Sequence, residues 1–483
     1  MNFRLINKVV GYILLVEAGG LVLPLLASLY FKEDTWFSFA LVAALCAVLG
    51  LVLARLPADE KDLMQGRDGY MAVAVAWVSL SVFGAVPYVV SGAIPHYVDA
   101  LFETISGFTT TGATILTDIE SVSKGVLFWR AETQWMGGMG VLVMFLALMP
   151  KLGGGSVHLM RAESPGPIKS KLVPKVGDTA KILYAIYVSL TAGEAVALRA
   201  AGLGWYESVT HAFTTMATGG FSVKAASIAA YSSSPAVIWI IIVFTFLAGV
   251  NFSLIYAGIR GNWRQIWKSQ ELRLYCSLML GAILLVCLDL FIQTGERIGD
   301  SFTDAAFQVI TIMTTTGYAT RDFALWPTFS RCILVALMFV GACAGSTAGG
   351  VKVSRILIHI KNLRRDLGRV IHPKHVSVIT MDGERVDESV ITSCHSFLVA
   401  YILVLIASAL IVGWDNLGFE ESLTASMTCI GNVGPAMGLL GPTANFSILS
   451  HLSKIVLALE MLMGRLELLP ILVLLNPDTW RDR

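Results

Sequence analysis

The sequence has little charge. Only 14% of its 483 residues are Asp, Glu, Lys or Arg, whereas about 25% is usual for a soluble protein. Charge is almost absent from several stretches whose length is close to the ~20 apolar residues that cross a membrane as a helix. These stretches are 185–201, 236–258, 274–291 and 397–413. The pattern excludes a wholly water-soluble protein, and continuous apolar runs favour helices over a membrane barrel of alternating strands.

The sequence also lacks the motifs of common catalytic sites. It contains no His/Asp metal cluster, no G-x-S-x-G motif and no P-loop spacing. Its seven cysteines lie in apolar stretches without a C-x-x-C pair, so we predict small buried side chains and no disulfides. We therefore expect neither an enzyme nor an organic cofactor. The net charge of +1 gives no reason to expect a nucleic-acid partner.

Basic residues gather in alternate loops, whereas residues 415–450 contain no Lys or Arg. This asymmetry places both chain termini in the cytoplasm. The first apolar run, 9–29, is too long for the core of a signal peptide and is interpreted as a membrane span. The basic loops are 55–67, 151–181, 260–273 and 352–385.

After two ordinary spans near 8–31 and 36–56, one unit recurs four times. It consists of a long apolar span, a short half-apolar segment, a Thr/Gly cluster and a second span rich in glycine. The clusters recur about every 100 residues, a period that suits a duplicated membrane module. Each short segment is too short to cross a membrane, and so predicts a re-entrant helix. The short segments are 97–105, 205–216, 301–313 and 420–427.

The predicted fold is an all-α integral membrane protein with ten spans. Four tandem span–pore-loop–span repeats would stand in pseudo-fourfold symmetry, next to an N-terminal pair of spans. The boundaries that we expect are 1–68 for the N-terminal pair, then 69–151, 152–262, 263–370 and 371–483 for the four repeats.

The Thr/Gly clusters predict a cation filter. A permeating cation must exchange its water for other oxygens at little net free energy, and backbone carbonyls provide such oxygens without fixed charge. Glycine permits the backbone conformations that aim carbonyls inward, and the re-entrant helices would point their negative C-terminal ends at the axis. One such cluster would usually be an ordinary turn, but four between spans are specific. The filter residues that we expect are Thr110, Thr111, Gly112, Thr218, Gly219, Gly220, Thr315, Thr316, Gly317, Asn432, Val433 and Gly434.

Four stretches carry a resemblance to a known family. They are SGFTTTGAT at 106–114, QWMGGMG at 134–140, GACAGSTAGG at 341–350 and GRLE at 464–467. With them the chain resembles the Trk/Ktr/HKT superfamily of potassium transporters over its whole length, and the bacterial TrkH branch most. The resemblance implies a potassium path in a bacterial inner membrane, with a selectivity glycine in each repeat.

The same resemblance implies which backbone oxygens hold the transported K⁺. The selectivity glycines would be Gly112, Gly220, Gly317 and Gly434. Plant relatives that prefer sodium have serine at the first of these positions, so Gly112 favours potassium. The fourth loop departs from the Thr-x-Gly-aromatic form, because Pro435 follows its glycine. The carbonyls expected to contact K⁺ are those of Thr111, Thr218, Thr316 and Asn432.

A gate is expected below the filter. Ten residues from 341 to 350 are small, and because each Gly weakens a helix by about 1 kcal/mol relative to Ala, the span should break there into a loop. The resemblance implies that this loop gates the path. An intramembrane Arg usually faces a pore or a partner, so Arg465 should face the ion path or the loop. A structural ion pair with Glu467 is the less specific alternative. The gate residues that we expect are Gly341, Ala344, Gly345, Ser346, Thr347, Gly349, Gly350 and Arg465.

Three other polar residues receive plainer interpretations. Lys352 is expected to be an ordinary interfacial lysine. Gln134 and Asn251 are expected to form hydrogen bonds between helices, and the glycines at 137–140 to permit close helix packing.

The function that we predict is potassium uptake driven by the membrane potential. The alternative is an ion-coupled secondary transporter of another solute, and channel-like flux and symport are both left open. Coupled transporters usually need intramembrane carboxylates, so spans poor in Asp and Glu argue against that alternative. The resemblance also implies a homodimer and a cytosolic, nucleotide-binding, TrkA-like regulatory subunit. We expect this subunit to dock on the basic region 352–388, where Asp382 and Gly383 predict a hairpin within 376–385.

Overall fold

The computed structural model describes residues 3–56, 66–140, 176–372 and 377–477. These ranges are mostly helical, and their only strands are two residues long. Six helices in the described ranges are long and apolar enough to cross a membrane, or up to seven if a pair bent by 101° counts as one. The predicted all-α membrane fold is therefore confirmed.

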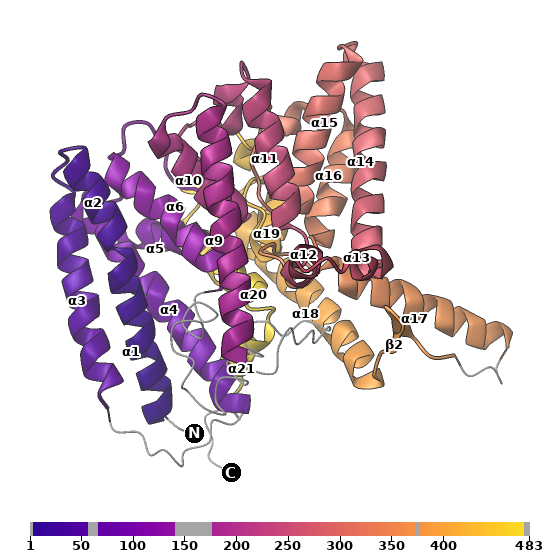
Figure 1. The fold of residues 1–483 in the computed structure, drawn as a ribbon, viewed down its shortest axis with the longest axis horizontal. Coiled ribbons are helices and arrows are strands. Elements are labelled where there is room, and N and C mark those ends of the chain that lie inside the picture. The colour runs from indigo at the N-terminus through magenta and orange to yellow at the C-terminus, as the bar shows by residue number, and fades with distance from the viewer. Residues whose placement is uncertain (1–2, 57–65, 141–175, 373–376, 478–483) are drawn as a thin grey trace.

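The N-terminal pair forms one edge of the molecule (Figure 1). Helix α1 (Phe3–Gly20) continues after Leu21 into α2 (Val22–Tyr30), and α3 (Trp36–Ala54) returns beside them. Glycine brings the two helices close together, because a Cβ at Gly50 would lie 2.8 Å from the carbonyl oxygen of Gly11. Leucine and valine side chains of α3 remain exposed, as expected for a surface that faces lipid.

Four units follow with the same order of elements: a long helix, a short helix, an irregular return and a second short helix. The short helices predicted to be re-entrant are all present and end within four residues of the expected positions. The domain boundaries remain a prediction. The units are α4 (Gly66–Val90), α5 (Tyr97–Phe108) and α6 (Lys124–Gly138); α9 (Val176–Ala200), α10 (Trp205–Met216) and α11 (Pro235–Ala248); α14 (Gln270–Thr294), α15 (Ile298–Met313) and α16 (Thr328–Val340); α18 (Glu388–Val412), α19 (Phe419–Gly431) and α20 (His451–Arg465).

The closing helices of the units are short, so ten long spanning helices are not found in the described ranges. Helix α11 bends by 101° into α12 (Phe252–Ile259). Helix α16 ends at Val340, because the next residue, Gly341, has a φ of 74°, outside the helical region. Helix α20 is separated from α21 (Leu469–Leu475) by Glu467 and Leu468, which both have positive φ. The sequence predicted the break after Val340, but the prediction of ten spans overlooked the other two breaks, because the apolar runs continue through them.

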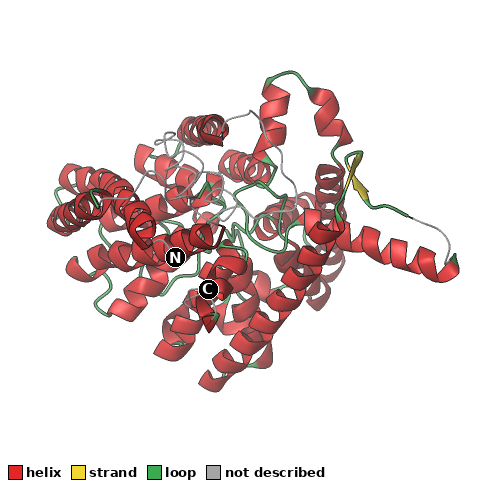
Figure 2. Cartoon of the chain, turned by 90° about the horizontal axis from the view of Figure 1, so that it is seen from below, coloured by secondary structure: helices red, strands yellow, loops and turns green. Residues whose placement is uncertain are grey.

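A polar arm projects from the other side of the molecule. Helix α17 (Val353–Ile371) extends away from the bundle, and the hairpin of β1 (Thr380–Met381) and β2 (Glu384–Arg385) lies beside its base (Figure 2). The turn residues Asp382 and Gly383 both have positive φ. This is the two-residue turn that Asp-Gly favours, so the predicted hairpin is confirmed. The short helix α13 (Trp263–Lys268) precedes α14.

The apolar core has two main parts. One joins the N-terminal pair to the first and fourth units, and the other joins the second and third units. Between them lies a buried polar region, made largely of threonines at the ends of the re-entrant helices. A polar region of this kind can persist inside a membrane protein because its groups bond one another.

All seven cysteines are free, and five are buried as predicted. The prediction is wrong for Cys332, which is exposed on α16, and Cys276 is only half-buried. Cys332 lies near the exposed Phe329 on a helix surface where apolar side chains face outward, and a small thiol is compatible with such a surface.

Candidate functional site

Four loops at the ends of the re-entrant helices share one backbone conformation. We call them the ring loops: 110–112, 218–220, 315–317 and 432–434. Each begins with a residue other than glycine at positive φ, and each ends two residues later with a glycine at positive φ. The pairs are Thr110 (55°) and Gly112 (85°), Thr218 (54°) and Gly220 (73°), Thr315 (56°) and Gly317 (76°), Asn432 (53°) and Gly434 (108°).

One hydrogen bond fixes each ring loop to its own helix. In every loop the middle residue donates its backbone N–H to the carbonyl oxygen five residues earlier. This bond satisfies a carbonyl that the helix end would leave unpaired and gives the four loops the same register. The bonds run from Thr111 to Ser106 (2.9 Å), Gly219 to Thr214 (2.8 Å), Thr316 to Thr311 (2.7 Å) and Val433 to Thr428 (2.8 Å).

The ring loops touch one another in cyclic order. Each terminal glycine lies against the middle carbonyl oxygen of the next loop, and the fourth loop lies against the first. A Cβ would approach that oxygen to 2.2 Å at Gly112, 1.8 Å at Gly220, 2.1 Å at Gly317 and 2.6 Å at Gly434. These contacts close a ring, and because each position combines positive φ with no space for a side chain, only glycine fits.

This register separates the expected carbonyl set into two layers. Thr111 and Thr316 share the middle layer with Gly219 and Val433, whereas Thr218 and Asn432 belong to the preceding layer with Thr110 and Thr315. The equivalent carbonyls could not be aligned from the sequence, because the second loop has two consecutive glycines and the fourth has no threonine. Which of these carbonyls bind potassium remains a prediction.

Gln134 of α6 supports the second ring loop from behind. Its Nε2 donates to the carbonyl oxygen of Gly219 (2.6 Å), and its Oε1 accepts from the backbone N–H of Phe221 (3.1 Å). The expectation of an ordinary bond between helices was therefore wrong. Gln134 is a positioning residue, and only its place in the QWMGGMG stretch could have indicated it.

Several glutamates are buried in the helices, contrary to the expectation of spans poor in acid. Glu103 of α5 accepts from Arg130 Nε (2.6 Å) and from the backbone N–H of Ile115 (2.9 Å), which holds the return of the first loop. Glu460 of α20 accepts from Ser426 Oγ (2.6 Å). The scarcity of acid therefore no longer argues against a coupled transporter. Further glutamates with little or no exposure are Glu17, Glu132 and Glu194.

A loop without helical structure lies at the inner end of the ring. It joins α16 to α17 through residues 341–352. The backbone N–H of Gly349 donates to Thr315 Oγ1 (2.7 Å), and Thr218 Oγ1 donates to Thr347 Oγ1 (3.3 Å). A Cβ at Gly349 would lie 2.9 Å from Cβ of Asn432. The loop therefore contacts three of the four ring loops.

Arg465 contacts the remaining ring loop, 110–112. Its Nη1 donates to the carbonyl oxygen of Thr347 (2.8 Å) and to Thr110 Oγ1 (3.3 Å), and its Nη2 donates to the carbonyl oxygens of Gly137 and Gly138 (2.5 Å each). Arg465 thus contacts both a ring loop and the loop 341–352, and its role in the ion path stays a prediction. The ion pair of Glu467 is with Arg355. Together, the loop 341–352 and Arg465 contact all four ring loops.

Lys352 ends the loop 341–352 and Asn251 packs on that loop, so their plainer interpretations were wrong. Lys352 is buried at positive φ, and its ammonium donates to the carbonyl oxygen of Ala348. Asn251 lies at the bend of the second unit, where its Oδ1 caps α12 by accepting from the backbone N–H of Ser253 (2.8 Å). A Cβ at Gly345 would lie 3.2 Å from Asn251 Nδ2, so this side chain packs on the loop.

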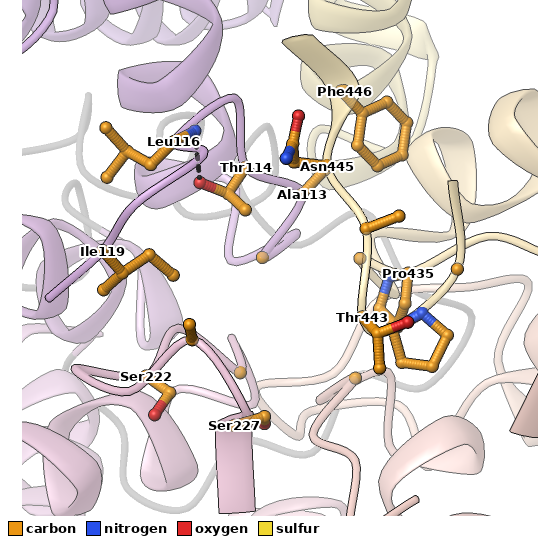
Figure 3. A pocket seen from close by; sticks show the side chains of 18 of the residues that line it. Ala113, Thr114, Leu116, Ile119, Ser222, Ser227, Pro435, Thr443, Asn445 and Phe446 are labelled. Atoms are coloured by element: carbon orange, nitrogen blue, oxygen red, sulfur yellow. Dashed lines mark hydrogen bonds between the residues drawn. The ribbon is translucent and has the colours of Figure 1, made fainter. Parts of the chain in front are cut away.

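A cavity of about 100 Å³ lies at the outer side of the ring. It is bounded by all four terminal glycines of the ring loops and by the segments that return from them. Figure 3 shows Thr114 and Leu116, Ser222 and Ser227, and Thr443 on separate segments around an open space. The described ranges contain no group of three His, Cys, Asp or Glu side chains that could hold a metal. Apart from the basic residues Arg130 and Lys224, the polar side chains that line the cavity are mostly hydroxyls of Ser and Thr, and such uncharged oxygens suit a permeating alkali cation.

Comparison with known proteins gives one consistent family. The family described as "TrkH: Cation transport protein" matches residues 36–480. The chain is 36% identical to the Trk system potassium uptake protein TrkH of Salmonella typhimurium and 34% identical to that of Halomonas elongata, with complete coverage of both chains. The crystal structure of the potassium transporter TrkH from Vibrio parahaemolyticus superimposes with a TM-score of 0.88 at 33% identity, again over both whole chains.

Proposed function

Because the chain belongs to the TrkH family of cation transport proteins, we propose that it carries potassium ions across the membrane through the ring. The observation that carries this proposal is the closed cycle of four ring loops, each ending on a glycine that admits no side chain. Each middle carbonyl oxygen lies at the contact between two neighbouring ring loops, and each ring loop follows the C-terminal end of a re-entrant helix, which carries partial negative charge. Such a site favours a cation that can shed its water.

The direction of transport follows from the membrane potential. A potential of 100 mV supplies about 2.3 kcal/mol per unit charge, which is enough to draw potassium into a cell without further chemistry. We propose a bacterial inner membrane with both termini in the cytoplasm, as the loop charges indicate. The N- and C-terminal ends lie at the same end of the molecule (Figure 1), which is consistent with this topology.

Flux into liposomes tests the function. The purified protein should admit potassium and rubidium along an imposed potential, while sodium and lithium compete weakly. The second candidate is a transporter coupled to protons or sodium, and it is favoured by the buried glutamates of the spans. Potassium uptake that requires an imposed proton or sodium gradient would support this second candidate. The absence of any potassium uptake would also support it.

The loop 341–352 is proposed as the gate. It occupies the inner end of the ring, and Arg465 holds it there through the carbonyl oxygen of Thr347. Glu271 at the start of α14 adds a second support, because its Oε1 accepts from the backbone N–H of Ala344 (2.7 Å). Opening would require these bonds to break together.

A TrkA-like regulatory subunit is proposed to act through the hairpin. Asp382 at the hairpin tip accepts from the backbone N–H of Gln270 (2.7 Å), which directly precedes Glu271. A displacement of the hairpin would therefore move Gln270, which is covalently joined to Glu271, the residue that bonds the loop 341–352. Replacing residues 380–385 by a Gly/Ser linker should weaken binding of that subunit at least tenfold in a pull-down titration. Binding at wild-type strength would rule out the hairpin as the docking surface.

A homodimer is proposed through α17. This helix exposes an apolar stripe at helical spacing, although it carries many charges elsewhere, and such a stripe is typical of a contact between helices. Leu363→Asp together with Leu367→Asp should convert the purified dimer to monomers in multi-angle light scattering. A dimer that persists would place the interface elsewhere. The exposed residues are Ile360, Leu363, Leu367, Val370 and Ile371.

A further inference from the structure

The outer cavity has an unexpected charge for the entrance of a cation path. Its lining includes two basic residues, Arg130 and Lys224, and no acidic residue. Clefts that collect cations usually present the opposite sign, because negative charge raises the local concentration of the ion. Positive charge at this entrance therefore needs a reason other than attraction of the transported ion.

The charge of Arg130 is already matched. Its Nε lies 2.6 Å from Oε1 of Glu103, both side chains are buried, and its guanidinium rests over the ring of Phe221. A buried pair of this kind presents little net charge to the cavity. Arg130 is thus part of the support of the first loop.

Lys224 is different. It lies four residues beyond the terminal glycine of the second ring loop and is half-buried. Its backbone is held in a tight turn, because its N–H donates to Ser222 Oγ (3.0 Å) and its carbonyl oxygen accepts from the N–H of Ser227 (3.0 Å). Within the described ranges the Lys224 ammonium has no carboxylate within ion-pair distance. The net positive charge of the cavity therefore belongs to Lys224.

We propose that Lys224 selects entering cations by valence and keeps divalent cations away from the ring. This inference rests on the proposed potassium function and adds a specificity residue to it. A fixed charge changes the local concentration of an ion by a Boltzmann factor whose exponent is proportional to the valence of the ion. An electrostatic potential that lowers the local concentration of potassium by a factor f must lower the local concentration of magnesium or calcium by a factor of f squared. The transported ion is thus excluded only slightly, whereas ions that bind carbonyl oxygens tightly and block the ring are excluded strongly.

The test compares Lys224→Gln with the wild type in liposomes, using rubidium uptake at low ionic strength with Mg²⁺, Ca²⁺ or Ba²⁺ outside. We expect rubidium uptake below saturation to rise about threefold, and the concentration of divalent cation that halves uptake to fall about ninefold, the square of that factor. Both changes should shrink in high salt, because the screening length falls from about 10 Å at 0.1 M to about 3 Å at 1 M.

Two further variants keep the test decisive. Lys32→Gln removes an exposed lysine from the turn between α2 and α3, away from the cavity, and should behave as wild type. Lys224→Arg retains the charge and should also behave as wild type, which separates loss of charge from loss of folding. Unchanged divalent inhibition in Lys224→Gln would overturn the proposal, as would equal changes for rubidium and divalent ions. Absence of rubidium uptake by the wild type would instead disprove the proposed function itself.

Discussion

Replacing Arg465 by glutamine should raise the resting potassium flux by about tenfold or more. Arg465 joins the loop 341–352 to α6 and to the first ring loop by four hydrogen bonds. Hydrogen bonds to a charged group contribute about 1.5–3 kcal/mol each, and ~1.4 kcal/mol already changes a closed-to-open ratio tenfold. Glutamine is too short to span these partners, so the closed state should lose more than one such bond.

The measurement is rubidium uptake into liposomes without the regulatory subunit. Arg465→Lys keeps the charge but lacks the planar fork, so it distinguishes two roles of the residue. A flux near that of Arg465→Gln would show that the hydrogen bonds hold the gate, whereas a wild-type flux would show that charge alone forms the barrier. Arg260→Gln, on an exposed turn, is the matched control. Reduced uptake in Arg465→Gln would contradict the role of the loop as a gate.

Serine at the ring glycines should reduce the preference for potassium over sodium in a graded way. Cβ would approach the neighbouring carbonyl oxygen to 1.8 Å at Gly220 and 2.1 Å at Gly317, but only to 2.6 Å at Gly434. The oxygen must move away by more than 1 Å in the first two cases to reach ordinary contact. We therefore expect selectivity to fall at least tenfold in Gly220→Ser and Gly317→Ser, and least in Gly434→Ser.

Competition of sodium and lithium with rubidium uptake measures this selectivity. Gly281→Ser is the matched control, because Gly281 lies in α14 with open space where its Cβ would stand, and it should keep wild-type selectivity. Equal selectivity in the three ring variants and the control would show that the ring does not set the preference for potassium over sodium. An order of severity other than the order of the Cβ distances would show that the contacts of the ring do not set its geometry.

The two sets of variants change different groups of one path, and their effects should be separable. Loss of Arg465 bonds changes how often the path is open, so flux should rise without a change in selectivity. Serine in the ring changes the oxygens that an ion contacts. The preference for potassium over sodium should therefore fall whether or not Arg465 is also replaced. A combined variant, Arg465→Gln with Gly317→Ser, should show both effects additively, because Arg465 bonds the loop 341–352, α6 and the first ring loop, whereas Gly317 lies against the fourth ring loop.

Local signals in the sequence identified most of the individual elements. The re-entrant helices followed from length and polarity, and the hairpin from Asp382 and Gly383. The break after Val340 followed from consecutive small residues, which disfavour a helix wherever they stand. Each of these signals is a property of neighbouring residues, and for that reason it could be interpreted without the fold.

Contacts between distant residues could not be interpreted in this way. Gln134 and Gly219 are 85 positions apart, and Arg465 and Thr110 are 355 apart. The burial of Glu194 and Glu460 was also concealed, because a single carboxylate in a long apolar run barely changes its hydropathy. The role of each side chain depends on which helix faces it, and a pattern of hydrophobic residues does not specify that.

The sequence by itself determined that this chain is a helical membrane protein with a fourfold Thr/Gly repeat and a glycine in each copy. Composition and period suffice for that conclusion, since they reflect the solvent and the repeat unit. Only the tertiary structure decided the register of the ring loops, the closure of the ring in cyclic order, and the position of Arg465 and the loop 341–352 beneath it. Those features depend on packing between units, where differences of a fraction of an ångström decide which atoms meet.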